Sequence, residues 1–270
     1  MRERTLGLLA VTGYFVAFFA LLIGLQHLQI AGLGDAAIPL TAVIILVLIL
    51  ALITLLLRHE GASFGSIGLT ARKALPQFFV GLAAGLAVCA LMIGSVLLFT
   101  PLEIGPASSG NTLPALSVAF FLIFLLGLME EIVFRSYPLF RFDDAVGTRT
   151  AIYATAVAFA FYHGLDASNL LGPGVWGLFY GWMALKTNSI ALPTGFHVGL
   201  NYMQALLGMK PKYGGALWEL EIDTQPSVLG AETLGFGLQI LLLIIGFVLV
   251  ERLIRQRQSE TITGKEASEA

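Results

Sequence analysis

The segment "LLGLMEEIVFRSY", residues 125 to 137, places three ionisable side chains, Glu130, Glu131 and Arg135, in an apolar run. Residues four apart lie on the same face of a helix, so Glu131 and Arg135 can form a neutralising ion pair. Glu130 points about 100° away from Glu131. It is therefore free to face a polar cavity, where a carboxylate can act as a general base.

Two histidines also lie inside apolar segments, His163 in "AFAFYHG" and His197 in "PTGFHVGLN". Asn201 follows His197 by four residues, so both can donate hydrogen bonds from one helix face, and Phe159 lies one turn before His163. The depth of each residue in the membrane follows from the number of helical residues between it and the nearest Lys or Arg expected on the cytoplasmic side. At the rise of an α-helix, Glu130, His163 and His197 lie at depths of roughly 16, 21 and 16 Å. The sequence thus predicts that three separate segments bring an acid and two imidazoles to similar depth near mid-membrane.

A glutamate with two histidines is compatible with two kinds of acyl-bond hydrolysis. In the first, Glu130, His163 and His197 hold a zinc ion with an open position for water. In the second, Glu130 and His163 activate water directly, while His197 and Asn201 stabilise the oxyanion. Spacing leaves both open, because the three side chains come from separate segments and the sequence has no local HExxH.

The elements that must position these residues are membrane helices. Of 270 residues, 57% are hydrophobic and 12% charged, whereas soluble domains have roughly 45 to 50% and about 25%. The mean hydropathy is +0.86. These values predict an all-α, polytopic membrane helix bundle. The net charge of -2 gives no indication of a basic surface that would bind nucleic acid. The eight expected spans lie near 6–25, 38–57, 77–99, 114–140, 150–163, 174–185, 189–207 and 234–250.

The distribution of lysine and arginine fixes the expected orientation. Lys210 and Lys212 fall on the side opposite the termini, and Arg135 lies within a span. All the other Lys and Arg residues fall on the side of the termini. This excess of basic residues on one side predicts that both termini are cytoplasmic. We expect one transmembrane bundle over residues 1–258, a disordered tail over 259–270, and a prokaryotic plasma membrane as location. The basic residues on the terminus side are Arg2, Arg4, Arg58, Arg72, Lys73, Arg141, Arg149, Lys186, Arg252, Arg255, Arg257 and Lys265.

Three motifs resemble a known family. "EEIVFR" fits EExxxR, "FAFYH" fits FxxxH and "HVGLN" fits HxxxN, in the order found in the CPBP intramembrane endopeptidases. That family includes the type II CAAX prenyl endopeptidases and the Abi proteins, and the resemblance covers about residues 114–205.

The resemblance implies roles for individual residues. Glu130 and His163 would activate water, and His197 and Asn201 would stabilise the oxyanion. Glu131, Arg135 and Phe159 would support them. It favours a glutamate-dependent protease without an obligatory metal, acting in the bilayer on a peptide or a CAAX-type prenylated protein; zinc held by Glu130, His163 and His197 is the alternative.

Two other functions compete with the protease. A proton-coupled transporter could use Glu130 as a relay carboxylate, but the sequence shows no duplicated half with broken helices. A non-catalytic membrane scaffold or immunity protein could retain the same fold. Cys89, Trp176 and Tyr180 are interpreted as packing or interfacial residues with no part in chemistry.

Overall fold

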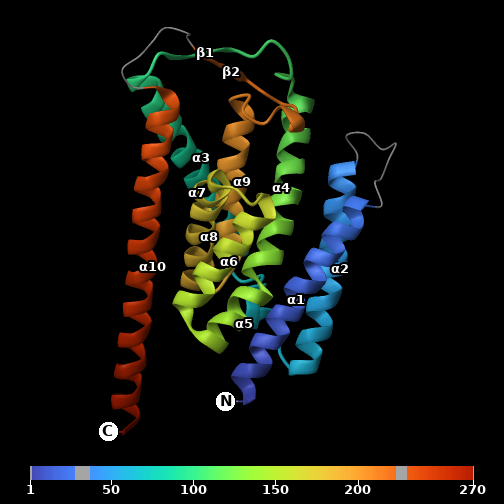
Figure 1. Ribbon diagram of the computed structural model, residues 1–270, viewed down its shortest axis with the longest axis vertical. Coiled ribbons are helices and arrows are strands. Elements are labelled where there is room, and N and C mark those ends of the chain that lie inside the picture. Colours follow the sequence, from blue (N-terminus) through green and yellow to red (C-terminus); the bar gives the residue numbers. More distant parts are fainter. Residues whose placement is uncertain (1, 28–36, 223–229, 270) are drawn as a thin grey trace.

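The computed structural model describes residues 2–27, 37–222 and 230–269. It is an all-α membrane bundle, as predicted, with one small sheet at one end (Figure 1). The elements in chain order are α1 (Arg2–His27), α2 (Ala37–Glu60), the 3-10 helix η2 (Phe64–Ile67), α3 (Ala74–Phe99), β1 (Leu102–Pro106), α4 (Leu113–Arg135), α5 (Tyr137–Val146), α6 (Thr148–His163), α7 (Ala167–Leu171), α8 (Pro173–Thr187), α9 (Ala191–Leu206), the 3-10 helix η3 (Pro211–Tyr213), β2 (Trp218–Ile222) and α10 (Ala231–Glu269).

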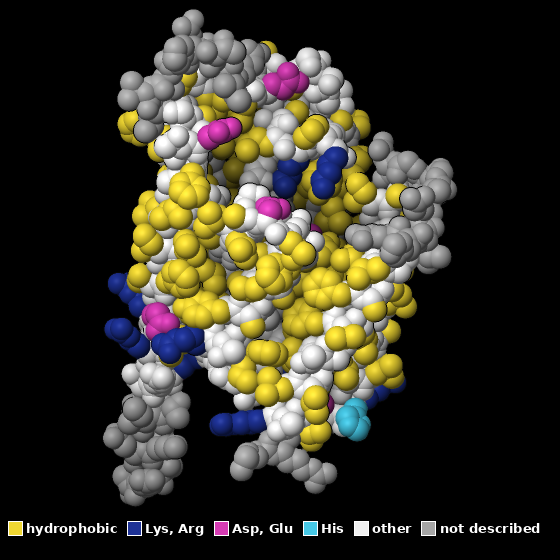
Figure 2. All heavy atoms as spheres, viewed as in Figure 1, with side chains coloured by type: hydrophobic (Ala, Val, Ile, Leu, Met, Phe, Trp, Pro, Cys, Tyr) yellow, Lys and Arg dark blue, Asp and Glu magenta, His cyan; other side chains and the backbone are white. Residues whose placement is uncertain are grey.

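Five segments in the described chain are long and apolar enough to cross a membrane: α1, α2, α3, α4 continued by α5, and α10. Apolar side chains cover the middle of the face in Figure 2, and basic side chains gather towards its lower end. The other expected spans correspond to α6, α8 and α9, which have 16, 15 and 16 residues. A helix of that length rises only about 24 Å, less than the roughly 30 Å of a bilayer core, so these three helices lie inside the bundle and end near the site.

Both ends of the chain lie at the same end of the bundle. The start of α1 and the end of α10 point downwards in Figure 1, whereas β1 and β2 cross the opposite end. That the termini face the cytoplasm remains a prediction from the charge distribution.

The predicted span 114–140 is confirmed as part of a candidate membrane span from Leu113 to Val146, but this span has a break. It is two helices, because α4 ends at Arg135 and α5 begins at Tyr137. Ser136 has a non-helical backbone, with φ -90° and ψ -111°. Pro138 follows two residues later and has no N–H to donate to the carbonyl one turn earlier. The break lets the chain turn at the lower end of the bundle directly after Arg135.

Two other features of the fold differ from expectation. A disordered tail was expected from residue 259, but α10 continues as a helix to Glu269; extending an existing helix adds one hydrogen bond per residue without a new nucleus. The loops at 102–106 and 218–222 pair as the antiparallel strands β1 and β2, with Ile104 opposite Leu220. Strands of this length, with Gly and Pro, carry little sequence signal.

Helices α3 and α9 approach backbone to backbone through glycines spaced four apart on each helix. A Cβ added at Gly81 or Gly85 of α3 would lie 2.2 Å from a carbonyl oxygen of α9. A Cβ at Gly195 or Gly199 of α9 would lie 2.0 or 2.2 Å from one of α3. Small residues at this spacing allow membrane helices to pack closely. The contact holds the turn of α9 that carries His197.

We expect Gly85→Ala to separate α3 from α9. Its Cβ would meet the carbonyl oxygen of Phe196 at 2.2 Å and the amide nitrogen of Leu200 at 2.7 Å. The cost should be roughly 1 to 3 kcal/mol of stability, as for overpacked cores, and thermal unfolding in detergent measures it. Gly94→Ala, on the same helix with no atom within 4 Å of the added Cβ, is the matched control. Equal melting temperatures for the two variants would refute the packing argument.

Candidate active site

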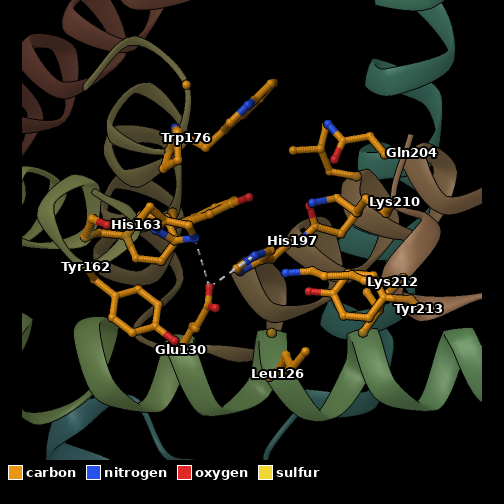
Figure 3. Close-up of a pocket in the computed structure, with 18 of the residues that line it drawn as sticks. Leu126, Glu130, Tyr162, His163, Trp176, His197, Gln204, Lys210, Lys212 and Tyr213 are labelled. Carbon is orange, nitrogen blue, oxygen red and sulfur yellow. Dashed lines mark hydrogen bonds and ion pairs between the residues drawn. The ribbon is translucent and has the colours of Figure 1, made fainter. Parts of the chain in front are cut away.

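Glu130, His163 and His197 meet in one cavity although they come from α4, α6 and α9 (Figure 3). The Oε2 atom of Glu130 lies 3.6 Å from Nε2 of His197 and 4.0 Å from Nε2 of His163. The cavity has a volume of about 560 Å³. α6 ends at His163, where Gly164 adopts a φ of +149° that other residues rarely adopt.

Hydrogen bonds on the other ring nitrogen fix how each imidazole faces the cavity. Nδ1 of His163 donates to the carbonyl oxygen of Phe159 at 2.9 Å, since a carbonyl can only accept. Nδ1 of His197 lies 3.0 Å from Oε1 of Glu131 and donates to that carboxylate. The Nε2 atoms of both rings are therefore left to face Glu130. One carboxylate oxygen and two imidazole nitrogens form the polar centre of the cavity.

Oε2 of Glu130 is a buried oxygen that has no hydrogen-bond partner within the described chain. The residue as a whole is 9% exposed, because the cavity reaches it. Burying a carboxylate oxygen without a hydrogen bond is costly. A group that enters the cavity and donates a hydrogen bond to this atom is therefore strongly favoured there.

Glu131 supports two partners rather than one. Its Oε2 lies 3.7 Å from Nε of Arg135, the expected i,i+4 pair, and both side chains are fully buried. Its Oε1 accepts the hydrogen bond from His197. The Arg135 guanidinium in turn lies over the rings of Phe159 and Tyr180, 4.1 and 5.1 Å from their centroids. The side chains of Arg135, Glu131 and His197 thus form a continuous series of contacts behind the cavity.

The other two predicted residues lie beside this centre. Phe159 packs edge-on against His163 with ring centroids 4.6 Å apart, and also lines the cavity. Asn201 lines the cavity one turn beyond His197 on α9. All predicted site residues are therefore brought to one cavity or to its immediate support. Their catalytic roles remain predictions.

The donor set allows a test of the zinc alternative. Glutamate oxygen and histidine Nε2 atoms are ordinary zinc ligands, and ligating histidines usually donate Nδ1–H to a carboxylate or carbonyl, as here. The ligand types and their orientation therefore fit zinc. Across residues 2–27, 37–222 and 230–269, however, no three His, Cys, Asp or Glu side chains are grouped closely enough to hold an ion. Zinc thus fits the chemistry of the site but not its present spacing.

Sequence reasoning missed several residues of the cavity. Tyr180, interpreted as packing, stacks on His197 with centroids 4.7 Å apart and planes 16° apart, and it lines the cavity. Tyr162 lines it beside Glu130. Lys210 and Lys212, after α9, also line it. The lysines did carry a signal, since they were the two exceptions to the positive-inside pattern.

The cavity opens towards the end of the bundle that carries the strands. Its lining includes Ile38 at the start of α2, Pro173 at the start of α8 and Gln204 near the end of α9. These helix ends lie away from the termini in Figure 1. Basic side chains border a hollow in the upper part of the face in Figure 2. A molecule would therefore reach Glu130 from the side opposite the termini.

Comparison with known proteins supports the class of site that this geometry suggests. Residues 112–203 match the family model described as Type II CAAX prenyl endopeptidase Rce1-like. The match runs from the N-cap residue of α4 into α9 and contains Glu130, His163, His197 and Asn201. This segment is therefore similar to the type II CAAX prenyl endopeptidases, which confirms the resemblance found in the sequence. No curated protein matches the chain.

We expect Glu131→Leu to destabilise the bundle by about 3 to 5 kcal/mol, because it leaves the Arg135 cation buried without a counter-charge. The double variant Glu131→Leu with Arg135→Met should recover most of that loss. Thermal unfolding in detergent distinguishes the two. The matched control is Glu251→Leu, because Glu251 pairs with Arg149, which is 59% exposed, and such a pair is worth at most about 1 kcal/mol. A double variant no more stable than the single one would contradict the charge-compensation account.

Proposed function

We propose that this protein is an intramembrane endopeptidase that hydrolyses a peptide bond of a membrane-associated substrate with water activated by Glu130. One observation carries the proposal: a buried carboxylate oxygen without a hydrogen-bond partner among the described residues faces two imidazole Nε2 atoms inside a cavity that reaches the protein surface. A carboxylate held in this way can take a proton from water. The family match of residues 112–203 supports a protease as the class of enzyme.

The proposed reaction begins with a water molecule between Glu130 and His163. Glu130 takes a proton from it as the oxygen attacks the carbonyl carbon, and the carbonyl electron pair moves onto the oxygen. His197, with a proton on Nε2, and the amide of Asn201 donate hydrogen bonds to the resulting oxyanion. As the tetrahedral intermediate collapses, the C–N bond breaks. The proton held by Glu130 passes to the departing amine, so that the carboxylate is regenerated.

Glu131 and Arg135 would act through His197. Glu131 holds Nδ1–H of His197 at 3.0 Å, which keeps Nε2 directed into the cavity. The Glu131 carboxylate thus orients the imidazole, as the aspartate does in serine protease triads. Arg135 balances the charge of Glu131, and the stacked Tyr180 ring limits rotation of the imidazole.

The substrate side follows from the orientation. If the basic end of the bundle faces the cytoplasm, the cavity opens to the outer side of the membrane. We propose a prokaryotic plasma membrane as the location and a membrane-associated peptide as the substrate. A CAAX-type prenylated protein made in the cytoplasm would have to approach from the other side, so this orientation favours a substrate without a cytoplasmic prenyl anchor.

The test of the proposed function is cleavage of a membrane-anchored peptide library by the purified protein in detergent. We expect Glu130→Gln to lower kcat about a thousandfold, as is typical when a general base is lost, while the variant keeps its fold. Glu103→Gln, an exposed glutamate of β1, is the control and should cleave normally. Equal cleavage by Glu130→Gln and the parent protein would overturn the proposal.

The zinc alternative is tested in the same assay. Zinc held by Glu130, His163 and His197 would supply a Lewis acid and an activated water. Under the proposed mechanism, exhaustive treatment with a strong chelator leaves kcat unchanged, because Glu130 itself takes the proton. Loss of cleavage on chelation, with recovery on adding zinc, would replace the glutamate mechanism with the metal one.

A further inference from the structure

Lys210 and Lys212 lie in the segment between α9 and β2 and line the same cavity as Glu130. In Figure 3 they lie on the far side of His197 from His163. Among the described residues neither forms a salt bridge, although the ammonium of Lys212 lies 5.0 Å from the centroid of the Tyr213 ring. The mechanism proposed above gives neither lysine a role.

The environment of Lys210 argues against a purely structural role at the membrane surface. A lysine that extends to the headgroups keeps its ammonium in water. Burial instead lowers the pKa of Lys210, Lys212 lowers it further, and the charge of Glu130 offsets part of the shift. Lys210 is also half-buried, and it lines the cavity that contains Glu130.

A charge count shows what the cavity lacks. Its lining carries two ammonium groups and the carboxylate of Glu130, and the second proton that His197 holds in the proposed reaction adds a further positive charge. Behind it, Glu131 and Arg135 cancel each other. The cavity thus has more positive than negative charge, and an anionic ligand would offset the excess.

We propose that Lys210 and Lys212 bind a carboxylate of the peptide substrate and so select the bond that is cleaved. This inference rests on the proposed peptidase function. Charge-assisted hydrogen bonds from lysine to a carboxylate are among the stronger polar contacts in proteins. Gln204 and Tyr213 line the same part of the cavity and add polar groups.

The size of the cavity limits how far the carboxylate lies from the scissile bond. A volume of about 560 Å³ is that of a site for a small molecule, so it holds a few residues of extended peptide. The carboxylate therefore belongs to the chain terminus just beyond the cleaved bond or to an acidic side chain in that stretch. Both sources present the same chemistry to the lysines.

The test uses three membrane-anchored peptides of the same sequence: one with a free C-terminal carboxylate, one with a C-terminal amide, and one with the amide and an aspartate one residue earlier. We expect the parent protein to show a KM about tenfold higher for the plain amide than for the acid, as for loss of a charge-assisted hydrogen bond. Lys210→Gln with Lys212→Gln should remove this difference, acting on KM more than on kcat. Lys73→Gln, an exposed lysine at the opposite end, should preserve it.

The third peptide identifies the source of the carboxylate. Recovery of a low KM with the aspartate peptide means that any nearby carboxylate suffices, and a high KM means that the chain terminus is selected. Either result supports the inference. Equal KM values for the acid and plain amide peptides overturn it. The inference is also overturned if the lysine substitutions change KM only in vesicles of anionic lipid and to the same extent for every peptide. The lysines would then bind lipid phosphate.

A binding measurement separates failure of this inference from failure of the proposed function. Affinities of the three peptides for Glu130→Gln, measured by fluorescence anisotropy, do not depend on cleavage. Preference for the carboxylate peptides, with no cleavage by the parent protein, supports the lysine site and overturns the peptidase. Cleavage without preference supports the peptidase and overturns the lysine site. Neither binding nor cleavage overturns both.

Discussion

The buried carboxylate of Glu131 is the interaction on which the site depends. It lies between the guanidinium of Arg135 and the imidazole of His197, and both Glu131 and Arg135 are fully buried. A single buried charge in a bilayer protein is expensive, and removal of one partner from a buried pair costs more than the pair itself contributes. The same carboxylate therefore compensates Arg135 and orients His197. Neither requirement can be relaxed without disturbing the other.

Backbone packing determines where the contacts that join Arg135, Glu131 and His197 lie relative to Glu130. The glycines of α3 and α9 bring the two helices into contact, and His197 lies between Gly195 and Gly199 on the contacting turn. On α4, the break at Ser136 ends the helix directly after Arg135. The aromatic rings of Phe159 and Tyr180 fill the space around the guanidinium and the imidazoles. The site is thus built on rigid helices, as precise positioning of catalytic groups requires.

The sequence was sufficient to predict the membrane bundle and the grouping of Glu130 with two histidines, because hydropathy and helical spacing are local properties. It also predicted the Glu131–Arg135 pair from their separation of four residues. It could not show that Glu131 also holds His197, because that contact joins residues 66 apart. The pairing of β1 with β2 and the stacking of Tyr180 on His197 likewise depend on long-range packing. The break at Ser136 had a local signal in Pro138, but the strong apolar run obscured it.

In the proposed reaction Glu130 acts as a base on water and not as a nucleophile. Single-turnover cleavage in water enriched in the heavy oxygen isotope tests it directly, with mass measurement of both the product and the Glu130-containing fragment of the protein. If Glu130 is a general base, one heavy oxygen enters the new carboxylate of the product and none enters Glu130. Heavy oxygen in Glu130 would show that its carboxylate attacks the peptide to form an acyl-enzyme intermediate, and would contradict the account.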